Sequence, residues 1–83
     1  MTTYYVYLLR SMKDGRFYTG HTANLRNRLA QHNGGRVRST KARRPLELVY
    51  WESFKTRAEV MRREKKLKAF GLAEKEKLVK GFK

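Results

Sequence analysis

The chain has 83 residues, no cysteine and a formal net charge of +14, from 21 Lys and Arg against 7 Asp and Glu. This length predicts one domain with a small core, over residues 1–83. The absence of cysteine excludes disulfides and cysteine-bound zinc, and the longest apolar run, YYVYLL, is too short to span a membrane. The N-terminus lacks the pattern of a secretory signal, so we expect a cytoplasmic protein whose basic surface binds a polyanion, most commonly nucleic acid.

The chain opens with a predicted β-hairpin. Residues 4–10 are apolar on both faces, which is typical of a central strand covered on both sides, and residues 16–20 form the second arm. Asp14-Gly15 between the arms is a strong turn signal. We therefore expect a tight turn of two residues at this position.

The hairpin places two tyrosines on one face of the sheet. A two-residue turn puts Ser11 opposite Tyr18 and Leu9 opposite Gly20, and Tyr7 then shares the face of Tyr18. A shift by one paired step keeps that result, because side chains alternate with a period of two. The two tyrosines either fill the core, as half-buried strand tyrosines often do, or line a functional site beside the glycine.

The rest of the chain predicts three helices and one more strand. A helix over residues 23–33 can be capped by Thr22 or Asn24, and a basic loop follows over 34–45. Residues 46–54 alternate as a third strand. The sequence TRAE at 56–59 is a capping box that opens a helix over 57–69, and a short helix over 73–80 comes after Gly71. The order β-β-α-β-α-α predicts an α/β (α+β) fold with a small three-stranded antiparallel sheet flanked by helices.

Two polar residues occupy the apolar stripes of the predicted helices. Arg28 lies between Leu25 and Leu29 in the stripe of the first helix, where it either extends over the core into water or binds a phosphate with its guanidinium fork. Glu64 lies in the stripe of the second helix, where it either pairs with Lys68 or binds Mg²⁺ through a hard carboxylate oxygen. Of the seven acidic residues, Glu64 is the best candidate for a metal ligand.

The histidines and the basic loop provide further candidates. His21 follows the second strand and His32 ends the first helix, and each is either structural or suited to acid–base work or phosphate contact. We expect phosphates of a nucleic acid to be gripped by His32 and by the cations of the loop. These cations are Arg36, Arg38, Lys41, Arg43 and Arg44.

These residues together resemble the GIY-YIG nuclease superfamily. Tyr5-Val6-Tyr7 and Tyr18-Thr19-Gly20 resemble its two tripeptides, and Arg28 and Glu64 fall where the family carries its helix arginine and glutamate. The match runs in order over residues 4–70 and is closest to small stand-alone members. Tyr5 and Thr19 depart from the tripeptides, and no Asn or Gln follows Asn33, although larger members carry one after the glutamate helix.

The resemblance implies a metal-dependent endonuclease of low sequence specificity. It implies that Tyr7 activates or positions the attacking water, that Tyr18 assists, and that Arg28 holds the scissile phosphate. It further implies that Glu64 holds one Mg²⁺ or Mn²⁺ ion and that His21 is an auxiliary acid or phosphate contact. The metal, the arginine and the basic surface would each favour the phenolate of a tyrosine, whose pKa is otherwise near 10.

Two other functions remain open at this point. The chain could be a non-catalytic nucleic-acid-binding module on the same fold, or an adaptor that docks on a larger protein partner. A carboxylate in a basic cleft argues against a purely binding role, because gripping phosphates does not require one. We expect DNA ahead of RNA as the partner, and no membrane.

Overall fold

The computed structural model describes residues 2–82 and confirms the predicted order β-β-α-β-α-α. A single turn of 3₁₀-helix, Lys41–Arg43, lies in the basic loop. The main elements are β1 (Tyr4–Ser11), β2 (Phe17–Thr22), α1 (Leu25–Asn33), β3 (Leu46–Phe54), α2 (Arg57–Lys68) and α3 (Leu72–Gly81). Within residues 2–82, the helices are too short and too polar to cross a bilayer.

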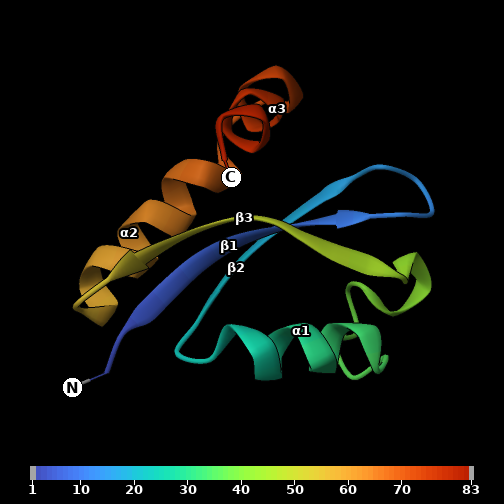
Figure 1. Ribbon diagram of the computed structural model, residues 1–83, viewed down its shortest axis with the longest axis horizontal. Coiled ribbons are helices and arrows are strands. Elements are labelled where there is room, and N and C mark those ends of the chain that lie inside the picture. The colour runs from blue at the N-terminus through green and yellow to red at the C-terminus, as the bar shows by residue number, and fades with distance from the viewer. Residues whose placement is uncertain (1, 83) are drawn as a thin grey trace.

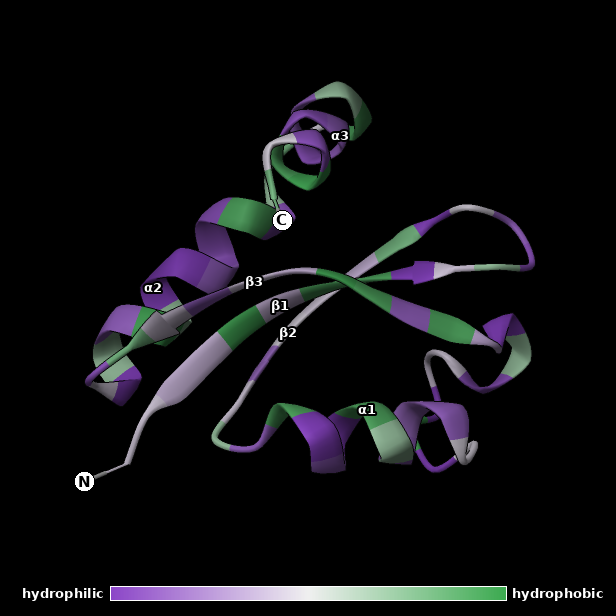
Figure 2. Cartoon of the chain, in the orientation of Figure 1, coloured by the Kyte–Doolittle hydropathy of each residue, from purple (hydrophilic) through white to green (hydrophobic). Residues whose placement is uncertain are grey.

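The three strands form one antiparallel sheet in the order β2-β1-β3. Figure 1 shows α1 on one face of this sheet and α2, followed by α3, on the other. The first strand is therefore central, as its apolar character on both faces predicts. Figure 2 shows the corresponding hydrophobic segment in the middle of β1, whereas most of α2 is hydrophilic.

The two faces of β1 build two separate parts of the core. Val6 packs with Val60 and Leu67 of α2, and all three side chains are fully buried. On the opposite face, Tyr7 and Leu9 pack with Leu46 and, more loosely, with side chains of α1. Because successive strand residues point to opposite faces, one strand supplies both layers and holds α1 and α2 at fixed positions.

The hairpin has a longer loop than its turn signal predicts. Strand pairing ends at Ser11, whose amide donates to the carbonyl of Arg16, so the loop spans residues 12–15 rather than two residues. Gly15 has a φ of +74°, which favours glycine. The register moves by one paired step: Leu9 lies opposite Tyr18, and Tyr7 lies opposite Gly20. The even shift leaves the predicted face of each side chain unchanged.

Local capping fixes where the helices begin. Asn24 caps α1 by accepting a hydrogen bond from the amide of Asn27, so the helix starts at Leu25, two residues later than predicted. The predicted capping box of Thr56 and Glu59 is present at the start of α2. This cap sets the phase of α2, and with it the direction in which Glu64 points.

Candidate active site

A pocket of about 260 Å³ opens where β1, β2, α1, α2 and the loop after α1 meet. The pocket contains six of the residues that the sequence singles out as site candidates: Tyr7, Tyr18, His21, Arg28, His32 and Glu64. The sheet separates α1 from α2, so residues of these two helices can meet only past its edge. The outer strand β2 forms that edge, and both of its predicted site residues line the pocket.

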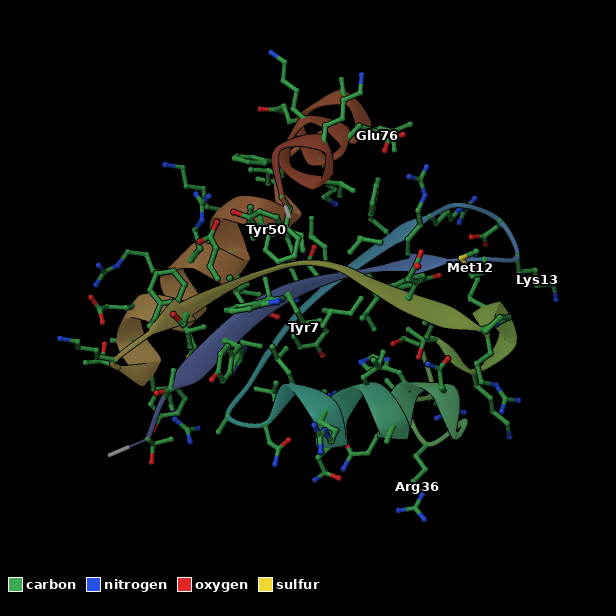
Figure 3. All side chains as sticks on the ribbon, in the orientation of Figure 1. Tyr7, Met12, Lys13, Arg36, Tyr50 and Glu76 are labelled. Atoms are coloured by element: carbon green, nitrogen blue, oxygen red, sulfur yellow. The ribbon has the colours of Figure 1, made fainter. Side chains whose placement is uncertain are left out.

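Tyr7 lies at the centre of the pocket's polar contacts. Its side chain is buried, and its Oη lies 3.1 Å from Nε2 of His32 and accepts a hydrogen bond from Nε of Arg28 at 3.3 Å. Figure 3 shows this side chain between the sheet and α1. Burial raises the pKa of Tyr7, and the hydrogen bond and charge of Arg28 oppose that rise without cancelling it. The resting phenol is therefore neutral, although the nearby cation alone would favour the phenolate.

The absence of a side chain at Gly20 leaves room for the ring of Tyr7. A Cβ at this position would lie 2.6 Å from Cζ of Tyr7 and still closer to Oη. Any larger residue would therefore push the phenol away from its partners. Gly20, beside which the sequence predicts a functional site, therefore makes room for the first tyrosine.

His32 is buried against Tyr7 in the wall of the pocket. Its side chain is only 5% exposed, its ring stands edge-on to the Tyr7 ring, and Nδ1 lies 2.8 Å from Oγ1 of Thr40. Burial lowers the pKa of His32, and the charge of Arg28 lowers it further, so the ring is neutral at pH 7. The sequence offers His32 as a contact for nucleic acid, whereas in the structure its partners are Tyr7 and Thr40.

Arg28 is held inside the site. Its Nε donates to Tyr7 and its Nη1 donates to Oε1 of Gln31 at 2.9 Å. The guanidinium is therefore oriented by two protein acceptors on the wall of the pocket. Gln31 carries no signal in the sequence that marks it as a site residue.

Glu64 reaches the pocket from the other helix layer. Its Oε1 lies 2.7 Å from Nδ1 of His21, and its Oε2 lies 3.3 Å from Nζ of Lys68. Glu64 thus pairs with Lys68, as predicted, and also lines the pocket. The carboxylate side chain is only 16% exposed, whereas the lysine is 60% exposed and can move aside.

The donor set around Glu64 limits which metal could bind. No group of three or more His, Asp and Glu side chains able to hold a metal occurs within residues 2–82. A zinc-type site is thereby disfavoured, because zinc takes three or four protein ligands. Mg²⁺ commonly binds through one or two carboxylates and takes its remaining ligands from water and substrate phosphates. The single carboxylate of Glu64 fits that pattern.

The basic loop borders the same pocket. Val37, Ser39 and Thr40 line it, while Arg36 and Arg38, which alternate with them, are exposed. Figure 3 shows Arg36 extending away from the body of the protein. The loop therefore lines the pocket with Val37, Ser39 and Thr40 and exposes the cations of Arg36 and Arg38 to solvent.

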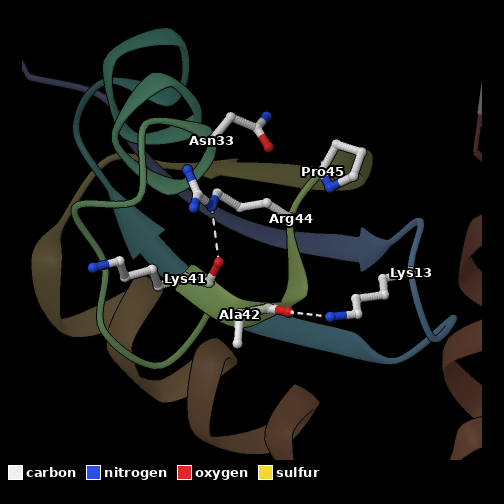
Figure 4. Close-up of a pocket in the computed structure, with 6 residues that line it drawn as sticks. All are labelled: Lys13, Asn33, Lys41, Ala42, Arg44 and Pro45. Carbon is white, nitrogen blue, oxygen red and sulfur yellow. Dashed lines mark hydrogen bonds between the residues drawn. The ribbon is translucent and has the colours of Figure 1, made fainter.

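Other cations of the loop have structural partners. Arg43 is paired with Asp14 in the hairpin loop, and Arg44 donates to the carbonyl of Lys41 at 2.8 Å. Figure 4 shows this contact together with Lys13, which donates to the carbonyl of Ala42 at 3.3 Å. These contacts fasten the loop to the β1–β2 hairpin, while Lys41 and Arg44 stay exposed.

Comparisons with known proteins agree with this architecture. Residues 3–77 match the GIY-YIG catalytic domain. The chain is 44% identical over 80 residues to a UPF0213 protein of Staphylococcus haemolyticus, covering 95% of this chain and 96% of that protein. It is 42% identical over 77 residues to a UPF0213 protein of Natronomonas pharaonis, with coverages of 92% and 89%.

A solved structure is similar as well. The solution NMR structure of a UPF0213 protein from Bacillus halodurans matches with a TM-score of 0.59 at 37% sequence identity, over 94% of this chain and 83% of that one. The resemblance stated from Tyr7, Tyr18, Arg28 and Glu64 is thus confirmed at the level of the family. On these grounds this small protein belongs to the GIY-YIG nuclease family.

Proposed function

We propose that the protein is a metal-dependent endonuclease that hydrolyses phosphodiester bonds in nucleic acid with little sequence preference, and that DNA is its substrate ahead of RNA. The observation that carries this proposal is the meeting of Tyr7, Arg28 and Glu64 in one pocket, although they come from a strand and two helices on opposite faces of the sheet. A binding surface needs cations, but it needs neither a buried phenol nor a carboxylate among them.

Tyr7 and His32 supply the proton transfer. The phenol donates its proton to Nε2 of His32, which the lowered pKa keeps free to accept, while the phenol oxygen takes a proton from the attacking water. The water oxygen forms the new bond to phosphorus, and the bond to the leaving nucleotide oxygen breaks with its electron pair. That oxygen takes a proton from water or from His21, which lies at the same pocket.

Arg28 and Glu64 act on the phosphate. Two donors of Arg28 are engaged by Tyr7 and Gln31, which orients the guanidinium so that its other N–H groups can meet the phosphate oxygens. Glu64 would hold one Mg²⁺ or Mn²⁺ ion, which stabilises charge on the phosphate oxygens when it is bound. Lys68 would lose its pair with Oε2 of Glu64 if that oxygen held the ion. Tyr18 packs against the cluster that contains Tyr7 and Leu9 and lines the same pocket, where it would assist.

Nicking of supercoiled plasmid tests the proposal. We would compare the wild type with Glu64→Ala and Tyr7→Phe, each with Mg²⁺, with Mn²⁺ and with a chelator. Glu47→Gln serves as the matched control, because Glu47 is an exposed carboxylate on β3 and does not line the pocket. Nicking should require metal, persist in Glu47→Gln, and fall by about 10²-fold or more in the two site variants.

Two outcomes would overturn the proposal. If the wild type binds plasmid in a salt-sensitive manner without nicking it, and leaves structured RNA intact as well, the protein is a binding module on this fold. If nicking survives Glu64→Ala unchanged, the activity belongs to a contaminant or the metal is held elsewhere. Folding of every variant would be checked by circular dichroism, so that loss of activity is not confused with unfolding.

A further inference from the structure

Thr40 is a buried polar residue in the middle of an exposed loop. It is 1% exposed, although its neighbours Ser39 and Lys41 are both exposed. Its backbone begins the 3₁₀-helix of the loop, a position where a threonine side chain usually caps the first turn. Here the hydroxyl makes no capping hydrogen bond and instead faces His32. The side chain of Thr40 therefore does not cap the 3₁₀-helix that follows it, and contacts His32 instead.

The hydrogen bonds around Thr40 can be assigned a direction. Oγ1 lies 2.8 Å from Nδ1 of His32 and 3.4 Å from the carbonyl oxygen of Val37. A carbonyl oxygen only accepts, so Val37 offers the hydroxyl proton of Thr40 an acceptor other than Nδ1 of His32. With its proton directed to Val37, the same oxygen accepts a hydrogen bond from Nδ1–H of His32. This places the single ring proton of the neutral imidazole on Nδ1 and leaves Nε2 as an acceptor.

The other end of the imidazole agrees with this assignment. Oη of Tyr7 already accepts from Nε of Arg28, and its own proton needs an acceptor. Nε2 of His32, at 3.1 Å, is the acceptor that the structure provides. With the opposite tautomer, two donors would converge on Oη, and the phenol proton would be left without its partner. A continuous chain thus runs from Arg28 through Tyr7, His32 and Thr40 to Val37.

We propose that Thr40 is a positioning residue that holds His32 in its Nδ1–H tautomer, so that Nε2 can take the proton of Tyr7. This inference rests on the proposed role of Tyr7 as the group that activates water. When the proton arrives on Nε2, both ring nitrogens become donors, and Nδ1–H stays bound to Thr40. The proton therefore moves without rotation of the ring or exchange of its other partner.

The position of Thr40 also connects the reaction to the basic loop. Arg38 and Lys41, which are exposed and suited to phosphates, lie two residues before it and one residue after it. A single short segment therefore carries both exposed cations and the hydroxyl that orients the base. Substitution of the hydroxyl should affect the chemical step rather than the grip on nucleic acid.

Nitrogen NMR of the labelled imidazoles tests the inference directly. The protein contains only two histidines, so the signals of His32 can be assigned by comparison with His32→Gln. In the free wild type at neutral pH we expect Nδ1 protonated and Nε2 unprotonated. Thr40→Val keeps the shape of the side chain and removes the hydroxyl, so the tautomer should become mixed or inverted, while Thr40→Ser should restore the wild-type spectrum.

Kinetics provide the second measurement. Thr40→Val should lower kcat by about 10²-fold, within the range of a lost general base, and should leave KM for DNA nearly unchanged. Thr40→Ser should recover most of the rate. An Nε2–H tautomer in the wild type, or a tautomer unchanged by Thr40→Val, would overturn the inference. The NMR measurement needs no substrate, so it is independent of nuclease activity. If the protein shows the expected tautomer but does not cut nucleic acid, the role of Thr40 is supported and only the proposed reaction is refuted.

Discussion

The hydroxyl of Tyr7 lies 3.1 Å from Nε2 of His32, a residue 25 positions later in the chain. The two groups meet because the face of β1 that carries Tyr7 packs against α1, and His32 lies near the end of that helix. Burial raises the pKa of the phenol and lowers the pKa of the imidazole. Both groups are therefore neutral at neutral pH, with the proton of the pair on the tyrosine.

We predict that His32 makes the protein less stable in mild acid. The folded-state pKa of His32 lies below its ordinary value of 6.5, so the unfolded chain takes up a proton first as the pH falls. The free energy of unfolding should therefore decrease below about pH 6.5, until the folded-state pKa is reached. Urea unfolding at pH 7.5 and pH 5.5 measures this change.

The variant His32→Gln isolates that contribution. Tyr7, Arg28 and Thr40 are the groups that face the imidazole, and only Arg28 among them is charged in this pH range. The variant should be less stable than the wild type at pH 7.5, and the difference should shrink at pH 5.5. An equal difference at both pH values would show that His32 has the same pKa in the folded and unfolded chains.

We predict that Gly20→Ala displaces Tyr7. The added methyl would meet Cζ at 2.6 Å, so the ring or the strand must shift. Overpacking of this kind costs about 1–3 kcal/mol of stability. The fraction of nicking activity lost should exceed the fraction of protein that this cost unfolds. Gly81→Ala is the control, since a Cβ there meets nothing within 4 Å. Thermal unfolding and nicking would be measured for both variants.

A double variant shows whether the contact is the cause. If Gly20→Ala acts through the phenol, its cost in stability should be smaller in a Tyr7→Phe background, where Oη is absent and less of the ring needs to move. Additive costs in the double variant would mean that the strand itself, rather than Tyr7, is disturbed by the methyl group.

We predict that metal binds at Glu64 in competition with Lys68. In the wild type, Mn²⁺ should broaden the NMR signals of the His21 imidazole, which lies 2.7 Å from the carboxylate, more than those of His32. Glu64→Gln should abolish this difference. Lys68→Ala should tighten metal binding several-fold, because it removes the cation that lies 3.3 Å from Oε2. Weaker Mn²⁺ binding by Lys68→Ala would show that the lysine does not compete with the ion.

We predict that the cations of the basic loop differ in their effect on nucleic-acid binding. Arg36→Gln and Arg38→Gln should each reduce the slope of log affinity against log salt by about 0.9 for duplex DNA, as expected for one lost phosphate contact. Arg43→Gln should change the slope less, because Arg43 is engaged by Asp14. Fluorescence anisotropy over a range of salt concentrations measures the slope for the wild type and for all three variants. Slopes equal to that of the wild type in all three variants would exclude the loop from the interface.

Much of the candidate site could be proposed from the sequence, for a physical reason. Alternation along β1 and β2 has a period of two, so Tyr7 and Tyr18 had to share a face, even though the loop is longer than its turn signal predicts. Helical periodicity likewise put Arg28 and Glu64 on inward stripes. The resemblance to the GIY-YIG family then implied that these four positions belong to one site.

The sequence by itself thus determined the order of the elements, the central place of β1, the capping box of α2 and the strongly basic surface, because each depends on local pattern or on composition. Only the tertiary structure decided what the polar groups do. It buried His32 against Tyr7, turned Thr40 inward from a basic loop and set Glu64 against His21 on the face of the sheet that α2 covers. These partners lie 8 to 43 positions apart and repeat with no period, so packing alone brings them together.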